Sequence, residues 1–169
     1  MISSYAERYH PFMPVVPERF LSARTVQQTA SEECFLLTAI LTIASKDRPE
    51  LGRLHDHIWA YMQQLILQVA LGSSRTRQVG AVEGLLILAE WAPHGGGSTS
   101  TSAVVAEDGE DSAWALVGLA VRQGYLLHLE KHSFRSEATG EAKSVADRNR
   151  LAWTCRLLGK AILFVLCVR

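Results

Sequence analysis

The sequence predicts an all-α protein, an irregular helical bundle of about five to seven helices with a long Gly/Ser-rich loop at residues 92–110. Apolar residues recur at helical spacing in several segments, and no segment of any length alternates between apolar and polar residues as a strand would. Helix start and stop signals flank the periodic segments. Because 48% of the 169 residues are apolar, the chain is long enough to bury a substantial core as one domain.

The first predicted helix follows a proline-rich connector. Residues 11–17 hold three of the five prolines and are expected to be extended and free of helix. The helix then begins with Thr29 as N-cap and Glu32 three residues later, which together form a capping box. Its apolar residues lie on most faces, so residues 29–45 are expected to be the most buried helix.

The second predicted helix is amphipathic. Asp47 is expected to cap it, with Pro49 and Glu50 in the first turn, and Gly72 ends it. Its apolar stripe consists of Leu51, Leu54, Ile58, Met62, Leu65 and Val69. The residues expected to face away from this stripe are His55, Gln63 and Gln64.

Three more helices complete the expected order. The third spans residues 76–91, and the loop at 92–110 separates it from a fourth that begins near Asp111. A fifth begins near Ala146. The three cysteines, Cys34, Cys155 and Cys167, have neither metal-ligand nor redox spacing, so we expect buried thiols in a reducing compartment.

Two polar residues interrupt the otherwise apolar stretch GLAVRQGYLLHLEKH, residues 118–132. Because an unpaired buried charge is costly, we expect Arg122 to pair with Glu83 or Glu90, which project from an apolar face of the third helix. Gln123 is expected to bond an exposed carbonyl at a neighbouring helix end. The alternative for Arg122 is that its apolar stem carries the guanidinium to solvent.

The sequence shows no constellation that indicates catalysis or metal binding. Glu83 and Glu90 lie about 10.5 Å apart along a helix axis at 1.5 Å per residue, farther than the roughly 5–9.5 Å between carboxylates in glycoside hydrolysis. His55 and His57 point about 200° apart on a helix, so their imidazoles diverge. Because nucleophile elbows and phosphate-binding loops are also missing, we predict no catalytic, cofactor-binding or metal-binding residue, and no enzyme.

The charge balance and the hydropathy of the sequence argue against two classes of partner, nucleic acids and membranes. Lysine plus arginine and aspartate plus glutamate number 17 each, so no surface for nucleic acid is expected on electrostatic grounds. The N-terminus lacks the apolar run of a secretory leader. The apolar run at residues 161–168 is far shorter than the roughly 20 residues of a membrane span, so no membrane partner is expected.

Five motifs in a fixed order resemble a known family. They are YAERYHPFMPVVP, FLLTAILTIASKD, VEGLLILAEWAP, SAWALVGLAVRQGYLLHLE and NRLAWT, which together cover residues 5–154. They resemble the regulatory domain of fungal zinc-cluster transcription factors, the domain named after the xylanolytic activator. The resemblance divides the chain into a lead-in with the proline-rich connector at 1–28, a partial regulatory domain at 29–154 and a divergent tail at 155–169.

The resemblance implies an all-helical domain that regulates transcription in the nucleus without contacting DNA itself. In the family, zinc and DNA are bound through a six-cysteine cluster near the N-terminus. No residue here matches that cluster, so we expect no cofactor in this chain and DNA contact only through a separate domain. The implied partners are other transcription-factor segments or transcriptional regulators. The alternative function is a helical ligand-sensing or protein-interaction module without a DNA partner in its own chain.

The resemblance stops at Thr154, where relatives continue with further helices. We therefore expect a fragment truncated at its C-terminal side, with apolar helix faces that lack their usual neighbours. Exposed apolar patches of more than a few hundred Å² mark interaction or aggregation sites. A large patch near the C-terminal helix and self-association in solution are the expected consequences.

Overall fold

The computed structural model describes residues 1–21, 30–91 and 105–129, and these residues form helices and turns but no strand. The all-α prediction is therefore confirmed. Short 3₁₀ helices precede two of the α-helices: η2 at Pro49–Leu51 and η3 at Ser74–Thr76. The six α-helices of the described residues are α1 (Ile2–Arg8), α2 (Glu18–Leu21), α4 (Cys34–Lys46), α5 (Gly52–Ala70), α6 (Val79–Trp91) and α7 (Val105–Leu126).

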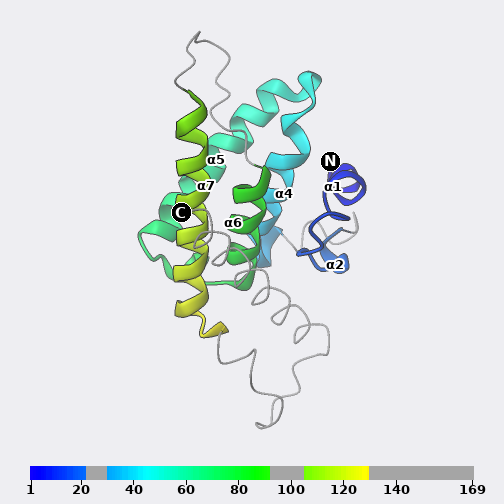
Figure 1. Ribbon diagram of the computed structural model, residues 1–169. Coiled ribbons are helices and arrows are strands. Elements are labelled where there is room, and N and C mark those ends of the chain that lie inside the picture. Colours follow the sequence, from blue (N-terminus) through cyan, green and yellow to red (C-terminus); the bar gives the residue numbers. More distant parts are fainter. Residues whose placement is uncertain (22–29, 92–104, 130–169) are drawn as a thin grey trace.

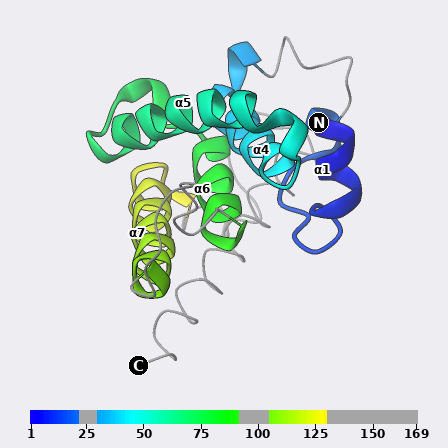
Figure 2. The ribbon, with the colours of Figure 1, turned by 90° about the horizontal axis from the view of Figure 1, so that it is seen from above.

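Helices α4 and α6 lie at the centre of the described residues, with α1, α5 and α7 packed around them. Helix α4 contacts α1, α5 and α6, and α6 in turn packs along α7, so that α1, α4, α6 and α7 follow one another across the molecule (Figure 1). Helix α5 crosses on one side of this row and reaches α7 at its far end (Figure 2). This arrangement gives α4 and α6 neighbours on most sides and leaves one face of α5 to solvent.

Helix α4 is the most buried of the described helices, as expected, with ten of its thirteen residues buried. Three of these carry hydroxyls, and each hydroxyl donates to a carbonyl one turn earlier in the same helix, which removes the cost of burying it. These residues are Thr38, Thr42 and Ser45.

The start of α4 differs from the prediction. The helix begins at Cys34, and its N-cap is Glu33, whose φ of −135° and ψ of 55° are not helical and whose side chain makes no cap hydrogen bond. Residues 30–32 are helical, and the non-helical Glu33 separates them from α4. Glu32 is exposed, and Thr29 lies outside the described residues. The predicted capping box therefore does not start α4, because the helix begins only where the apolar run begins.

Two glycines let α6 approach α4 closely. A Cβ at Gly84 would lie 2.7 Å from the ring of Phe35, and a Cβ at Gly80 would lie 1.9 Å from the carboxylate of Glu33. Both distances are far below van der Waals contact. Helix α6 begins at Val79 rather than at Thr76, which belongs to η3. Residues 80–88 are all buried, because α4 and α7 pack against α6 from two sides.

Helix α5 turns a somewhat different face to the core than its apolar stripe predicts. Met62, Leu65 and Val69 are buried as expected, but Leu54 is 46% exposed. His55, expected to face away, contacts α4: its Nδ1 lies 2.9 Å from Ser45 Oγ. At 100° per residue, the buried face is centred near His55 and Met62 rather than near Leu54.

The start of α5 also departs from the expectation. Pro49 and Glu50 lie in η2, whose N-cap is Arg48, while Asp47 is the C-cap of α4. The sequence signal at Pro49 marks the start of the 3₁₀ helix η2, and α5 follows directly from Gly52.

Helix α7 begins at Val105, inside the loop predicted for 92–110. Leu116, Ala120 and Gln123, at helical spacing, are buried. The predicted fifth helix near Ala146 and the tail at 155–169, with Cys155 and Cys167, lie outside the described residues.

The N-terminal lead-in belongs to the core. Residues 11–17 form no helix, as expected for the proline-rich connector, but most of them lie in turns and bends rather than in the extended segment that was predicted. Four apolar lead-in side chains are nevertheless buried, and three of them join the central apolar cluster with residues of α4 and α6. The buried apolar side chains of the lead-in are Tyr5, Val15, Val16 and Phe20.

Candidate functional site

The two polar residues of α7 meet the C-terminal end of α5. Gln123 is fully buried, and its Nε2 donates to the carbonyl oxygen of Val69 over 3.4 Å. The neighbouring Arg122 is exposed, and its Nη2 donates to the carbonyl oxygen of Ala70 over 2.7 Å. The predicted bond from Gln123 to a carbonyl at a neighbouring helix end is thereby confirmed.

The end of α5 needs such donors, because the last carbonyls of a helix have no partner within it. Part of the need is met locally by a Schellman motif. Gly72, at φ +76°, donates to Val69, and Ser73 donates to Gln68. Arg122 adds a positive charge where the helix dipole is negative, which stabilises a helix end by about 0.3–1 kcal/mol.

The structure gives Arg122 a different partner from the predicted Glu83 or Glu90. The contacts of α7 with the core run through Leu116, Ala120 and Gln123, whereas Arg122 lies beside that stripe and reaches α5. No ion pair joins Arg122 to a carboxylate among the described residues. The physical reason is helical phase: one residue away from Gln123, the side chain projects about 100° around the helix.

Glu83 and Glu90 do not share an environment, although they share a face of α6. Glu83 is fully buried, and Glu90 is exposed near the end of the helix. The charge of Glu83 acts on Tyr5 of α1. Burial, and to a smaller degree this charge, raises the pKa of the Tyr5 hydroxyl well above its ordinary value.

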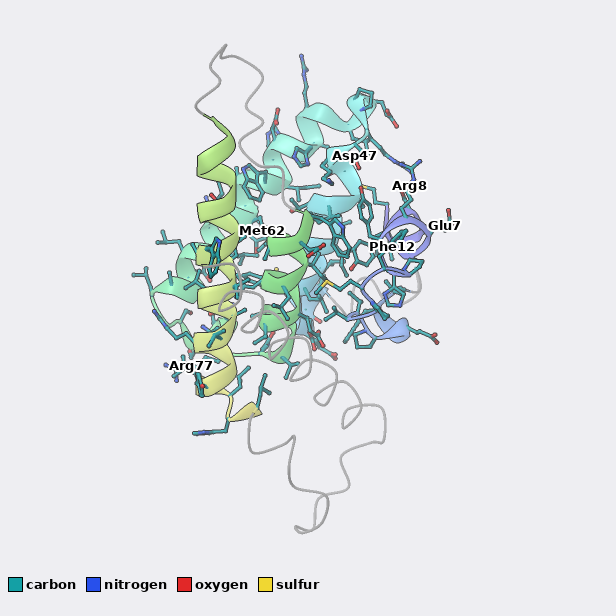
Figure 3. The ribbon with its side chains drawn as sticks, viewed as in Figure 1. Glu7, Arg8, Phe12, Asp47, Met62 and Arg77 are labelled. Carbon is teal, nitrogen blue, oxygen red and sulfur yellow. The ribbon has the colours of Figure 1, made fainter. Side chains whose placement is uncertain are left out.

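A cluster of aromatic rings joins α1 to α6, and sequence analysis missed it. The ring of Tyr9 stacks on Tyr5 at 5.9 Å and meets the edge of Trp91 at 5.6 Å, centroid to centroid. The Tyr9 hydroxyl donates to Asp47 at the end of α4, on the side where α1 lies (Figure 3). Burial and this hydrogen bond raise the pKa of Tyr9 to about 12. The signal in the sequence was the i, i+4 spacing of the two tyrosines.

Two buried polar atoms of the lead-in have no hydrogen-bond partner within the described part of the chain: Tyr5 Oη and His10 Nδ1. Burial lowers the pKa of His10, and the charge of Glu18 acts against that shift. Such atoms cost free energy when they are buried. The aromatic cluster therefore holds polar groups as well as apolar ones.

The histidines and the described cysteine have separate partners. His55 Nδ1 contacts Ser45 Oγ, and His57 Nδ1 contacts the carbonyl of Arg53, so the two imidazoles diverge as predicted. Cys34 is partly buried, and its Sγ lies 3.3 Å from the Tyr61 hydroxyl. This hydrogen bond is the main cause that raises the pKa of Tyr61.

The described ranges hold neither a candidate metal-binding group nor a helix that could span a membrane. No group of three or more His, Cys, Asp or Glu side chains there could hold a metal ion. No helix of that part of the chain is long and apolar enough to cross a membrane. Ser45, whose hydroxyl contacts an imidazole, is 1% exposed and already donates to its own helix, so a substrate cannot reach it.

Comparison with known proteins finds no family model, no curated protein and no solved structure that matches this chain.

Proposed function

We propose that this chain is a regulatory domain of a fungal zinc-cluster transcription factor, one that modulates transcription without contacting DNA. The observation that carries the proposal is the order of the five motifs. Three of them coincide with the helices around which the molecule is built: residues 35–47 lie in and just after α4, residues 82–93 include most of α6, and residues 112–130 include most of α7. The resemblance thus concerns residues of the core rather than scattered surface positions.

The proposed role sets the partners and the place of action. DNA and zinc would be bound by a separate domain, and this chain would act in the nucleus on other transcription-factor segments or transcriptional regulators. The chain itself would catalyse no reaction. Polar side chains of the described residues hold the helices together, as Gln123 does by its hydrogen bond to Val69. This supports a domain whose partners would bind its folded surface.

A transcription reporter tests this proposal. Residues 1–169 are fused between a heterologous DNA-binding module and a glutamine-rich activation segment, and reporter output is compared with that of the fusion without the insert. We expect the insert to lower reporter output. The matched variants are Gly84→Leu, which should disrupt the contact of α6 with α4 and restore output, and Gly118→Ala, which should not. Equal output from the wild-type and Gly84→Leu fusions would contradict the proposal.

A second candidate is a protein-interaction or ligand-sensing module without a DNA partner in its own chain. The observation that favours it is the number of large apolar side chains that remain at least 45% exposed. They are Phe12, Leu54, Tyr61, Leu67, Leu71, Tyr125 and Leu126. The reporter experiment separates the two candidates, because a module that acts outside transcription leaves reporter output unchanged.

A further inference from the structure

Four exposed apolar side chains lie where α5 and α7 end. Leu67 and Leu71 are 58% and 77% exposed, and Tyr125 and Leu126 are 63% and 45% exposed. The hydrogen bond from Arg122 to Ala70 fixes their placement, because Leu71 follows Ala70 directly and Tyr125 and Leu126 come one turn after Arg122. Figures 1 and 2 both show these two helix ends side by side. We name these four side chains the α5–α7 patch.

Two arginines flank the α5–α7 patch. Arg77 donates to the carbonyl oxygen of Gly72 over 3.2 Å, and a Cβ at Gly72 would lie 3.9 Å from Arg122 Nη2. Both arginines are exposed, and no carboxylate of the described residues forms an ion pair with either (Figure 3 labels Arg77). Their guanidinium groups are therefore available to an acidic partner.

The sequence around the α5–α7 patch carries no negative charge. Residues 57–82 and 112–129, which supply the patch and its arginines, contain neither aspartate nor glutamate, although acids equal bases over the whole chain. The first of these segments also contains Arg75, which is exposed. The patch is thus a local basic surface with an apolar centre on a chain of zero net charge.

We propose that the α5–α7 patch binds an amphipathic helical segment of a partner protein, with leucine-like residues on one face and aspartate or glutamate beside them. The apolar face of such a helix would cover the four exposed side chains, and its carboxylates would pair with Arg77 and Arg122. An extended peptide is a poorer fit, because the described residues offer no strand edge to extend. The inference names a partner for the second candidate function and holds whether or not the chain regulates transcription.

A second copy of the chain and a lipid surface are less suited to the α5–α7 patch. A two-fold contact through the patch would place its arginines opposite the same arginines, which repel. An anionic membrane would satisfy the charge, but four side chains bury little area in lipid, and stable attachment usually needs a larger apolar helix face. A helix with carboxylates at fixed spacing matches both the apolar centre and the two guanidinium groups.

Fluorescence anisotropy with the full 169-residue chain tests the inference. The probe is a labelled helical peptide of about 18 residues, or five turns, with leucines on one face and glutamates flanking them. Its matched partner carries lysine at every glutamate position. We expect the glutamate probe to bind at least about tenfold more tightly than the lysine probe, a difference of about 1.4 kcal/mol. Raising the ionic strength from about 0.05 to 0.5 M should weaken its binding.

Variants assign the binding to the α5–α7 patch. We expect Leu71→Ser, Tyr125→Ser and Arg77→Gln each to weaken the glutamate probe about fivefold or more, since each removes an exposed contact. The matched controls are Leu54→Ser and Arg53→Gln, at the opposite end of α5, which should leave binding unchanged. Circular dichroism confirms that each variant keeps its helices. If one variant fails to fold, the other two still decide the outcome.

Three results would overturn the inference. One is equal binding of the glutamate and lysine probes, and another is equal loss in patch and control variants. The third is a different occupant: binding to vesicles of anionic lipid, or self-association of the chain alone, that Leu71→Ser abolishes while the glutamate probe fails to bind. None of these results depends on the reporter experiment, so the inference and the regulatory role can fail separately.

Discussion

At the scale of single residues, Gln123 and Arg122 serve the same helix end in different ways. Gln123 is fully buried, and its bond to Val69 is long at 3.4 Å. Its Oε1 is buried without a partner among the described residues. Arg122 is exposed but makes a short charge-assisted bond to Ala70. The exposed residue therefore contributes more to the stability of this contact than the buried one.

This difference predicts the effect of two substitutions. Gln123→Met should stabilise the protein by up to about 1 kcal/mol, because it removes a buried, unpartnered oxygen and loses only a long hydrogen bond. Arg122→Met should destabilise it by about 0.5–1 kcal/mol, because the end of α5 loses a cation and a donor. Urea denaturation of both variants measures the two changes. A larger loss for Gln123→Met than for Arg122→Met would contradict this account.

His10 makes stability depend on pH. Burial lowers its pKa in the folded protein below the ordinary 6.5, so the unfolded chain binds a proton more readily. Its contribution to stability is then present above pH 6.5 and is lost as the pH falls through the folded pKa. We expect His10→Gln to flatten the fall in stability below pH 6.5. Chemical denaturation across that range measures it, and parallel curves for variant and wild type would exclude this role for His10.

At the scale of helices, the approach of α6 to α4 depends on glycine. The contact works because Gly80 and Gly84, one turn apart, present no side chain to α4. On α7, by contrast, the position of Gly118 is open: a Cβ there meets nothing within 4 Å. The glycines of these two neighbouring helices therefore differ: Gly80 and Gly84 allow close packing, whereas Gly118 has no packing role.

Alanine substitutions at these glycines should change stability in opposite directions. Gly84→Ala places a Cβ 2.7 Å from the Phe35 ring and should cost about 1–3 kcal/mol through overpacking. Gly118→Ala should stabilise by about 0.5–1 kcal/mol, because alanine has the better helix propensity. Thermal and urea unfolding compare the two variants directly. Stabilisation by Gly84→Ala would show that α4 and α6 are not held this close.

At the scale of the whole molecule, the N-terminal lead-in and the central helices share one core. Tyr5, Val16 and Phe20 pack in the same cluster as residues of α4 and α6. The Tyr9 hydroxyl bonds Asp47, and its ring meets Trp91, so the lead-in is attached by polar and aromatic contacts as well.

The expected self-association of the chain stays a prediction, which sedimentation at several concentrations tests.

The shared core predicts that the lead-in is needed for full stability. Deleting residues 1–21 removes several side chains that each gain about 1.5–3 kcal/mol on burial, so unfolding should require at least about 3 kcal/mol less free energy. The urea midpoint of the deletion variant measures the loss. The matched substitution within the lead-in is Phe12→Ser, which should leave the midpoint unchanged because Phe12 is 83% exposed. An unchanged midpoint after deletion would show that the central helices are stable alone.

The sequence by itself determined the features that depend on near neighbours along the chain. Helical spacing of apolar residues predicted the fold class and the buried α4. Glycine at position 72, which tolerates the positive φ that commonly follows a helix, predicted the end of α5. An amide among apolar residues predicted a carbonyl partner for Gln123. These signals are local, because helix formation and capping involve residues within about one turn of each other.

Only the tertiary structure decided which distant groups meet. Arg122 bonds Ala70 rather than a glutamate, because the helix end that lies beside it belongs to α5. The apolar spacing of α5 predicted a buried face but missed its rotation toward His55, since the position of α4 sets that rotation. The α5–α7 patch likewise exists only because two helix ends far apart in sequence lie together. Contacts of this kind follow from helix packing, which the local pattern of residues along the chain does not specify at the level of one residue's partner.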